Sequence, residues 1–402
     1  MTQRILVIGA GFAGMWSALG AARLTILTGH EGDLEVALIA PQPDLHVRPR
    51  LYEENAASMR APLLDIFTAV GVRFVQGHVQ TIAEDGQSVT YVDAAGHVHM
   101  LGCDRLILAA GSTLNRPAIP GLAEHAFSVD QIDEAAVLEA HLLRLDALPE
   151  SPARNTVVVG GGGFTGIETA AEMPHRLRAV LGPQADVRVV VVEQSEQIGP
   201  ELGAGPRPVI EEALAELGVE LHLGDGVALI DAEGIVTQAG TRIPAQTVVW
   251  TAGARANPLT RQIAGQRDAF GRLHVDRSLK VIGQTHIYAT GDVARAETDD
   301  EGNLAAMACQ HAMNLGRSAG HNAAADLLGL DPIPYEQPFY VTCLDLGPWG
   351  AVYTEGWDRQ VKMRGEDAKA LKRKINTEWI YPPRADRAEV LEAADPLRIV
   401  VA

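Results

Sequence analysis

The sequence predicts an α/β fold, and two repeated patterns carry that prediction. The spacing G-x-G-x-x-G occurs twice, each time after an apolar run and before a helical segment, as in strand-to-helix turns that bind phosphate groups. An apolar strand followed by Ala-Gly also occurs twice, at 106–111 and 247–253. This repetition predicts two Rossmann-like dinucleotide-binding domains, the second inserted in the first, plus a small C-terminal α+β region.

The predicted domain boundaries follow from where the chain leaves and re-enters the first repeat. Two prolines within 149–155 mark a crossover to the second domain, and after Gly253 the chain returns to the first. We expect a discontinuous first domain at 1–150 and 255–330, a second domain at 151–254, and a C-terminal region at 331–402. A chain of 402 residues fits this division, because it is too long for one ordinary core.

The composition is that of a globular protein, with 47% apolar and 21% charged residues. Its 51 acidic and 33 basic residues give a net charge of −18, which argues against nucleic acid as a partner. The three cysteines are far apart and form no C-x-x-C pair, which fits a reducing cytoplasm. We predict a cytoplasmic protein without a signal peptide, a transmembrane segment or a metal site.

The first glycine pattern lies at residues 4–14. In it Gly9 allows the tight turn, Gly11 lets the backbone approach a pyrophosphate, and Gly14 lets the helix pack close to its strand. The next strand, 35–39, ends at Ala40, where an acidic partner for the cofactor ribose is expected. Two explanations stay open: another group holds that ribose, or the register of this strand is shifted.

Four further segments of the first half are predicted to frame the same cofactor. Arg48 lies in a loop that either is a solvated basic loop or covers the cofactor. A helix begins at 62–67, and a strand at 72–79 brings the backbone of Val79 toward the cofactor. Strands 88–92 and 97–101 form a hairpin, and strand 105–110 ends in Ala110 and Gly111, small residues that let backbone lie against a cofactor.

The second glycine pattern lies at residues 156–168, after a predicted helix at 131–145. Gly161, Gly163 and Gly166 take the same three roles, and a helix runs from about 164. Glu193 ends the following strand, 187–192, where it can accept hydrogen bonds from an adenosine ribose and repel a 2′-phosphate. We therefore expect NAD(H) rather than NADP(H) in this site.

The rest of the chain completes both predicted domains. A helix at 206–217 and a strand at 219–223 precede Gly253, which closes the second domain against its cofactor. Asp292 follows an apolar strand and a glycine, where it can accept hydrogen bonds from a cofactor sugar chain; the alternative is a helix-capping aspartate. A helix is expected at 304–328, then strands at 339–344 and 350–354.

Two dinucleotide sites in one chain suggest that one holds FAD permanently while the other admits NADH to reduce it. Near the C-terminus, residues 359–374 include seven basic and two acidic residues, beside an apolar stripe of Leu371, Ile375 and Trp379. A surface helix docked on its own domain is favoured over a helix that contacts the membrane. Membrane contact is therefore expected to be weak and peripheral at most.

Together these motifs resemble type II NADH:quinone oxidoreductases, a family of flavoproteins with two dinucleotide-binding domains. The resemblance covers most of the chain and lies in the segments at 8–14, 161–168, 250–253 and 289–292. It implies that Glu168 lies near the junction of flavin and nicotinamide. It also implies that 305–310 matches a quinone-side A-Q-x-A-x-Q motif, in which Gln310 is kept, Ala308 lies beside the cofactor, and Ala306 replaces the first glutamine.

The resemblance implies an NADH dehydrogenase that carries FAD and passes two electrons to a quinone or quinone-like acceptor. Glu168 and Gln310 are its candidate catalytic residues, and no protein nucleophile is needed. Two alternatives stay open: a soluble reductase for a ferredoxin-like protein or another small acceptor, and a non-catalytic flavin-binding protein with a structural or regulatory role. A homodimer and a place at the inner face of the cell membrane are also left open.

Overall fold

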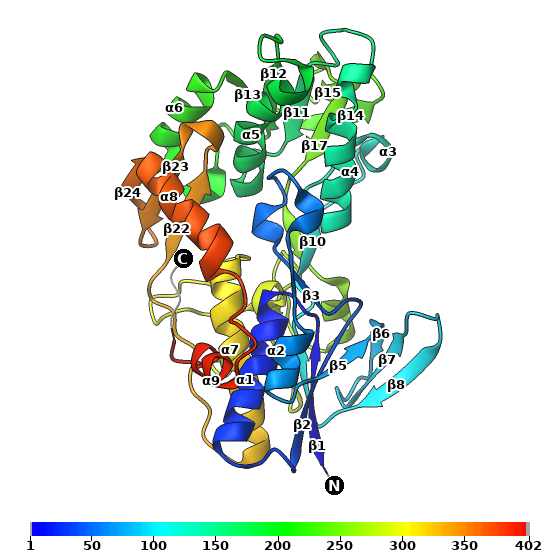
Figure 1. Cartoon of the computed structure of the whole chain (residues 1–402), viewed down its shortest axis with the longest axis vertical. Coiled ribbons are helices and arrows are strands. Elements are labelled where there is room, and N and C mark those ends of the chain that lie inside the picture. Colours follow the sequence, from blue (N-terminus) through cyan, green and yellow to red (C-terminus); the bar gives the residue numbers. More distant parts are fainter. Residues whose placement is uncertain (1, 399–402) are drawn as a thin grey trace.

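The computed structural model describes residues 2–398, and two parallel sheets organise it (Figure 1). The first sheet contains strands from both ends of the predicted first domain, because residues 287–289 pair with the strand at 105–108. In spatial order its strands are β20 (Ile287–Ala289), β9 (Arg105–Leu108), β1 (Gln3–Ile8), β2 (Leu34–Ala40) and β5 (Arg73–Gln76). The chain therefore passes through the second sheet and returns to the first.

The second sheet is also parallel and repeats the strand–turn–helix unit of the first. In spatial order its strands are β13 (Val219–Leu223), β12 (Arg188–Glu193), β11 (Thr156–Gly160) and β17 (Thr247–Trp250). The near-continuous valines of β11, β12 and β17 are buried, as expected for strands covered on both faces, whereas β13 lies at the edge and is largely half-buried. Helices α5 (Phe164–Leu181) and α6 (Arg207–Glu216) accompany this sheet.

The C-terminal region is an antiparallel sheet with a helix packed on it. Its strands are β22 (Val341–Asp345), β23 (Ala351–Glu355) and β24 (Gln360–Gly365). Helix α8 (Glu366–Lys374) lies beside this sheet and continues into a π-helical turn, Ile375–Trp379. The final helix, α9 (Arg387–Ala393), returns to the first domain, where Arg23 on α1 (Phe12–Leu27) contacts Asp395 at 2.6 Å.

The remaining elements are short. The helices are α2 (Leu64–Ala69), α3 (Leu122–His125) and α4 (Ile132–Leu142). The strands are β3 (Asp44–His46), β4 (Arg60–Pro62), β6 (His78–Ile82), β7 (Ser88–Val92), β8 (Val98–Gly102), β10 (Ser112–Leu114), β14 (Val227–Asp231), β15 (Gly234–Thr237), β16 (Arg242–Pro244), β18 (Ala254–Ala256), β19 (Leu273–His274) and β21 (Ala294–Arg295). Among them, β10 pairs with β18, so the two connections between the domains run antiparallel to each other.

Helix α1 packs closely against α7 (Cys309–Leu328), and glycines make the approach possible (Figure 1). A Cβ atom at Gly20 would lie 2.6 Å from the carbonyl oxygen of Arg317. On the other helix, a Cβ atom at Gly320 would lie 1.9 Å from the carbonyl oxygen of Ser17. Because no larger residue fits at these positions, the backbones of the two helices are in contact and the starts of α1 and α7 are held together.

The structure corrects several sequence-based boundaries. The strand predicted at 72–79 is two strands, β5 and β6, separated at Gly77, whose N–H donates to the Ala40 carbonyl at 3.0 Å. The helix predicted at 304–328 starts only at Cys309, and the helix predicted from 62 starts at Leu64. Strand β24 was not predicted, because its residues alternate between exposed and half-buried and include few apolar side chains.

The predicted apolar stripe near the C-terminus is only partly correct. The buried face of this helix is formed by Ala368, Lys372 and Ile375, whereas Trp379 is 38% exposed. Lys372 therefore points into the protein and does not belong to a basic surface stripe. The helix docks on its own domain, as the favoured interpretation predicted.

Candidate functional site

The turn between β11 and α5 has the geometry that its glycines predicted. Gly161 has φ +114°, a left-handed conformation that favours glycine, and a Cβ atom there would lie 2.9 Å from the backbone of Ala252. A Cβ atom at Gly166 would lie 1.9 Å from the carbonyl oxygen of Gly161, so only glycine lets the helix approach its strand. The N-terminus of α5 therefore directs its first backbone N–H groups toward the turn.

An acidic side chain meets these N–H groups. The backbone N–H of Phe164, the first residue of α5, donates to Oε1 of Glu201 at 2.7 Å. The same oxygen lies 2.7 Å from the position of a Cβ atom at Gly163. Its carboxylate stands in for a phosphate group at this helix N-terminus, which shows that the turn accepts an anion. No motif pointed to Glu201, because it lies 37 positions after Phe164 along the chain, in the 3-10 turn Pro200–Leu202 that follows β12.

Glu193 lies at the end of β12, beside the same turn, as predicted. Its Oε2 accepts the backbone N–H of Gly162 at 2.7 Å, and its Oε1 accepts that of Ser195 at 2.8 Å. The side chain is 8% exposed, and these two hydrogen bonds fix its orientation. Its role toward a ribose remains a prediction, because the contacts observed are with the protein's own backbone.

The first turn, between β1 and α1, is built in the same way, but among the residues that the structure describes no side chain lies beside its middle glycine as Glu201 does in the second turn. Gly9 has φ +108°, and a Cβ atom at Gly14 would lie 1.9 Å from the carbonyl oxygen of Gly9. A Cβ atom at Gly11 would meet nothing within 4 Å, so there is room for a ligand beside the backbone at that residue. The glycines of this turn therefore fit the phosphate groups of a dinucleotide.

The register of β2 shows which residue occupies the expected acidic position. Gly9 donates to the carbonyl of Ile39 at 2.9 Å, just as Gly161 donates to that of Val192 at 2.9 Å. Ala40 is thus the structural equivalent of Glu193, and the explanation by a shifted register is wrong. A cofactor bound at the first turn needs another partner for its ribose.

Arg48, Gly111 and Asp292 come together at the ends of β9 and β20, although they are far apart in sequence. Ser112 donates from Oγ to Asp292 Oδ2 at 2.6 Å, and Arg48 Nη1 lies 3.2 Å from that Ser112 oxygen and 3.8 Å from Asp292. Arg48 also forms an ion pair with Asp130, a residue that no sequence motif indicated. Gly111 lies against this cluster, since Arg48 Nη1 is 4.0 Å from the position of its Cβ atom.

The other predicted cofactor contacts lie on neighbouring backbone. Ala110 accepts through its carbonyl from Asn257 Nδ2 at 3.4 Å, and Gly253 has φ +76° between β17 and β18. The side chain of Val79 is buried in the hydrophobic core, so only its backbone is available for a cofactor. The role of each of these residues stays a prediction.

Glu168, on the first turns of α5, forms a buried ion pair with the C-terminal region. Its Oε1 accepts from Lys372 Nζ at 2.8 Å and from the backbone N–H of Asp345 at 3.0 Å. The side chains of Glu168 and Lys372 are 4% and 7% exposed. Lys372 was missed in this role, although its spacing from Ala368 and Ile375 places it on the buried face of α8.

Burial and neighbouring charges together set the pKa values of this pair. Burial raises the pKa of Glu168 to about 7, against the opposing effect of Lys372. Burial also lowers the pKa of Lys372, but the Glu168 carboxylate outweighs this and the pKa lies above its ordinary value. Lys369 pairs with Asp345 and lies 3.5 Å from Glu172, so three carboxyl groups face two ammonium groups. Burial first, and then this excess of negative charge, favour a proton on Glu168 near neutral pH.

Gln310 lies at the start of α7 and is 3% exposed, whereas Ala306 and Ala308 precede the helix in a half-buried loop. His311 accepts the backbone N–H of Ala306 at Nδ1, 3.3 Å away, and burial lowers the pKa of His311 to about 3, so the ring is neutral. Three aromatic rings form one stack that begins at His311, the residue after Gln310. They are His311, Tyr340 and Trp357, with centroids 5.2 Å apart for the first pair and 4.6 Å for the second.

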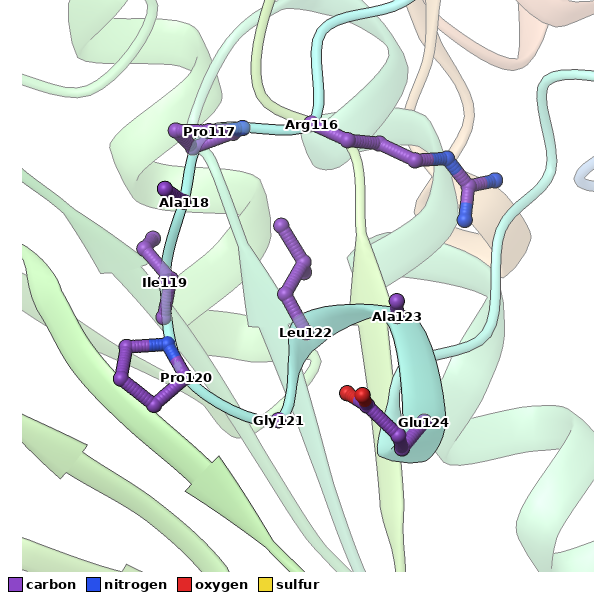
Figure 2. Close-up of a pocket in the computed structure, with 9 residues that line it drawn as sticks. All are labelled: Arg116, Pro117, Ala118, Ile119, Pro120, Gly121, Leu122, Ala123 and Glu124. Carbon is purple, nitrogen blue, oxygen red and sulfur yellow. The ribbon is translucent and has the colours of Figure 1, made fainter.

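A surface hollow of about 370 Å³ is lined by residues 116–124, a loop that runs into α3 (Figure 2). Its lining is largely apolar or proline, and it contains none of the predicted site residues. Arg116 and Glu124 are the charged residues of this loop, and we assign no role to the hollow. Within residues 2–398 no helix has both the length and the apolar character needed to span a membrane.

The chain is similar to oxidoreductases along most of its length. A model of the family described as pyridine nucleotide-disulphide oxidoreductase matches residues 3–316. An NADH dehydrogenase-like protein of Mycobacterium tuberculosis is 46% identical over 397 residues, 98% of each chain. The demethylphylloquinone reductase of Synechocystis is 29% identical over 360 residues, 87% of this chain and 86% of that protein.

A solved structure confirms the predicted fold class. The NDH2 of Plasmodium falciparum in complex with NADH superimposes with a TM-score of 0.78, covers 98% of both chains and is 14% identical in sequence. At that identity the match establishes the fold alone. The predicted domain boundaries and site residues remain predictions.

Proposed function

Because the chain belongs to the pyridine nucleotide-disulphide oxidoreductase family, we propose that it takes hydride from NADH through bound FAD and passes two electrons to a quinone or quinone-like acceptor. The NADH dehydrogenase-like relative and the quinone reductase among the similar proteins support this proposal. The geometric observation that supports it is the pair of glycine turns, each at the carboxyl end of an interior strand of its own parallel sheet; the first is open at Gly11, and the second already holds the Glu201 carboxylate.

The two turns suit different ligands. We assign FAD to the first turn, where the space at Gly11 is open and the Arg48–Asp292 cluster offers donors and acceptors for a sugar chain. NADH is assigned to the second turn, where Glu201 already marks an anion site and Glu193 provides an acidic acceptor. When bound, FAD supplies a carrier that accepts two electrons from the nicotinamide and releases them to a second substrate.

In this proposal the protein's own residues bind NADH, orient it and exchange a proton. The N-terminus of α5 binds the pyrophosphate of NADH once Glu201 moves aside, and Glu193 disfavours a 2′-phosphate. Glu168 Oε1 is occupied by Lys372 and by the backbone of Asp345, so a proton on this carboxyl group resides on Oε2. With a pKa of about 7, that group exchanges its proton near neutral pH, which suits a relay during reduction and reoxidation.

The acceptor is assigned to the side of α7. Gln310 supplies an amide that can hydrogen-bond a quinone carbonyl, and Ala306 leaves more room than a glutamine would. The largely buried stack of His311, Tyr340 and Trp357, which begins at the residue after Gln310, makes this part of the protein aromatic rather than charged and so favours an aromatic head group.

Acceptor assays on Gln310→Leu test this assignment. We expect the variant to keep its FAD and its rate of flavin reduction by NADH, but to lose about tenfold or more in kcat/KM for a water-soluble quinone, because the carbonyl loses its donor. The exposed Gln87→Leu is the matched control and should resemble the wild type. Fast reduction of ferredoxin with negligible quinone turnover by the wild type would instead identify a soluble reductase.

A further inference from the structure

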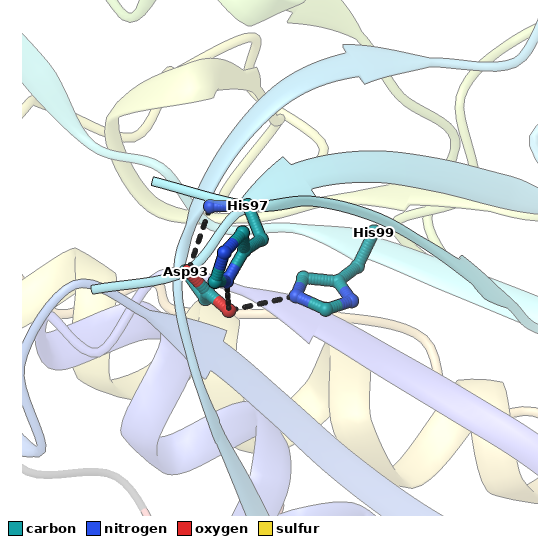
Figure 3. A group of neighbouring side chains, drawn as sticks. All are labelled: Asp93, His97 and His99. Atoms are coloured by element: carbon teal, nitrogen blue, oxygen red, sulfur yellow. Dashed lines mark hydrogen bonds and ion pairs between the residues drawn. The ribbon is translucent and has the colours of Figure 1, made fainter. Parts of the chain in front are cut away.

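The hairpin of β7 and β8 brings two histidines and an aspartate together outside the proposed redox site (Figure 3). His97 and His99 are two positions apart, so their side chains lie on the same face of the strand. Asp93 is directly opposite His97 across the turn, where the Asp93 N–H donates to the His97 carbonyl at 3.0 Å. Both imidazole rings and the carboxylate therefore project to one side of the hairpin end.

The three ligand atoms already lie close to one another. His99 Nε2 is 2.7 Å and His97 Nδ1 is 3.5 Å from Asp93 Oδ2, and all three atoms lie within 4.8 Å of one another. Ligands bound to zinc at about 2.0 Å in tetrahedral geometry are separated from each other by about 3.3 Å. The His97 separation thus nearly matches that value, and His99 needs to move outward by only about 0.6 Å to reach it.

The backbone of the turn holds the carboxylate in place. Asp93 Oδ1 accepts the N–H groups of Ala95 and His97, both at 2.9 Å, which leaves Oδ2 directed at the two rings. The ring of Tyr91 stacks on His99, with centroids 5.2 Å apart, and limits its rotation. The turn closes through Gly96, which has φ +86°. The donor groups are therefore arranged before any ligand arrives, which reduces the entropy lost on binding.

The geometry points to a binding site for a divalent transition-metal ion of the Zn²⁺ class, held by Asp93, His97 and His99. This site is independent of the proposed redox function and differs from the expectation, drawn from the sequence, that the chain has no metal site. Two imidazole nitrogens favour zinc and its neighbours over Mg²⁺ or Ca²⁺, which prefer oxygen ligands. Side-chain exposures of 74% for His97 and 44% for His99 leave the ion open to water or to an external fourth ligand.

Isothermal titration calorimetry with ZnCl₂ tests the site. The protein is the tag-free, FAD-loaded holoenzyme, treated with a chelator and dialysed. We expect one equivalent of Zn²⁺ to bind the wild type, and each of Asp93→Asn, His97→Ala and His99→Ala to weaken that binding by roughly tenfold or more, because each removes one of three ligands. Asp93→Asn keeps an acceptor for the turn, so it separates loss of the ligand from loss of the hairpin.

His30→Ala is the matched control. His30 also pairs with an aspartate at the surface, since its Nδ1 lies 3.3 Å from Asp33 Oδ2, but this pair offers only two ligands. It should bind Zn²⁺ as the wild type does. Circular dichroism and flavin content should be unchanged in all four variants. Absence of binding in the wild type at about 100 µM Zn²⁺, or equal affinity of the wild type and the three ligand variants, would overturn the assignment.

Discussion

Replacing Lys372 by methionine tests whether the buried ion pair joins the C-terminal region to the second domain. Methionine keeps the length and apolar stem of lysine but removes the ammonium group that lies 2.8 Å from Glu168 Oε1 and 2.9 Å from the Cys343 carbonyl. Of the two groups that donate hydrogen bonds to Glu168 Oε1, only the backbone N–H of Asp345 then remains, and the Glu168 side chain is 4% exposed. Its ionised form becomes unfavourable in the folded protein.

The expected loss depends on pH. Removing one partner of a buried ion pair costs about 3–5 kcal/mol in the free energy of unfolding. At pH 8, where the wild-type carboxylate is ionised, we expect the lower end of this range, because a wild-type pKa of about 7 lets the unpaired carboxyl group take up a proton at a cost of about 1.4 kcal/mol. At pH 5 Glu168 is protonated, because its pKa is about 7, and only hydrogen bonds of about 1–2 kcal/mol are lost. Equilibrium urea unfolding, followed by tryptophan fluorescence and circular dichroism, measures both values.

The control is Arg373→Met on the same helix. Arg373 pairs with Glu366 at 3.0 Å, but the two side chains are 60% and 71% exposed, so the expected loss is about 0.2–1 kcal/mol. The double variant Glu168→Gln/Lys372→Met, which buries no charge from this pair, should recover about 2 kcal/mol at pH 8 relative to Lys372→Met. Equal losses for Lys372→Met and Arg373→Met at pH 8, with no recovery in the double variant, would refute the reasoning.

Three further predictions concern Glu168, Glu193 and Glu201. The pKa of Glu168 is about 7 in the folded protein against an ordinary 4.5. As the pH rises from 4.5 to 7, the free energy of unfolding of the wild type should therefore fall by about 3 kcal/mol relative to that of Glu168→Gln. A difference between the two proteins that does not change with pH in urea unfolding would contradict this. Glu193→Arg should raise the ratio of kcat/KM for NADPH to that for NADH by about tenfold or more, while Glu193→Gln should leave NADH preferred. Equal ratios in the wild type and Glu193→Arg would argue against Glu193 as the residue that excludes the 2′-phosphate. Glu201→Ala should lower the KM for NADH by roughly fivefold at constant kcat, since removing the competing carboxylate contributes about 1 kcal/mol to nucleotide binding. Glu196→Ala, at an exposed position between β12 and Glu201, is the control and should leave the KM unchanged. A KM unchanged in both variants would show that Glu201 does not compete with the nucleotide.

The sequence was sufficient to predict the paired sheets, because each glycine turn is a local pattern whose strand, turn and helix are contiguous. It also placed Glu193 correctly at the end of β12. It could not predict the partner of Glu168, since Lys372 lies 204 positions away and only tertiary packing brings the two together. The excess of basic residues around Lys372 instead suggested a solvated surface, although its helical spacing from two apolar neighbours was a readable signal.

The aspartate and histidines of the β7–β8 hairpin lie close together in the sequence, unlike Glu168 and Lys372. The strands and the intervening turn were predicted, and the spacing D-x-x-x-H-x-H is visible in the sequence. Its significance depends on the pairing of Asp93 with His97 across the turn, which alternation alone does not establish. Similarly, the equivalence of Ala40 and Glu193 follows from the matching hydrogen bonds of Gly9 and Gly161, which the sequence alone does not show.

The glycine contacts between α1 and α7 constrain how the chain can change in length. A deletion of one residue between Ala13 and Gly20 would rotate the following part of α1 by about 100°. The carbonyl of Arg317, now 2.6 Å from a Cβ position that glycine leaves vacant, would then face a side chain. Insertions and deletions in these helices should therefore abolish folding far more often than substitutions elsewhere on their surfaces. In a scan of single-residue deletions, measured by flavin retention, the deletions that are not tolerated should cluster in the facing parts of α1 and α7.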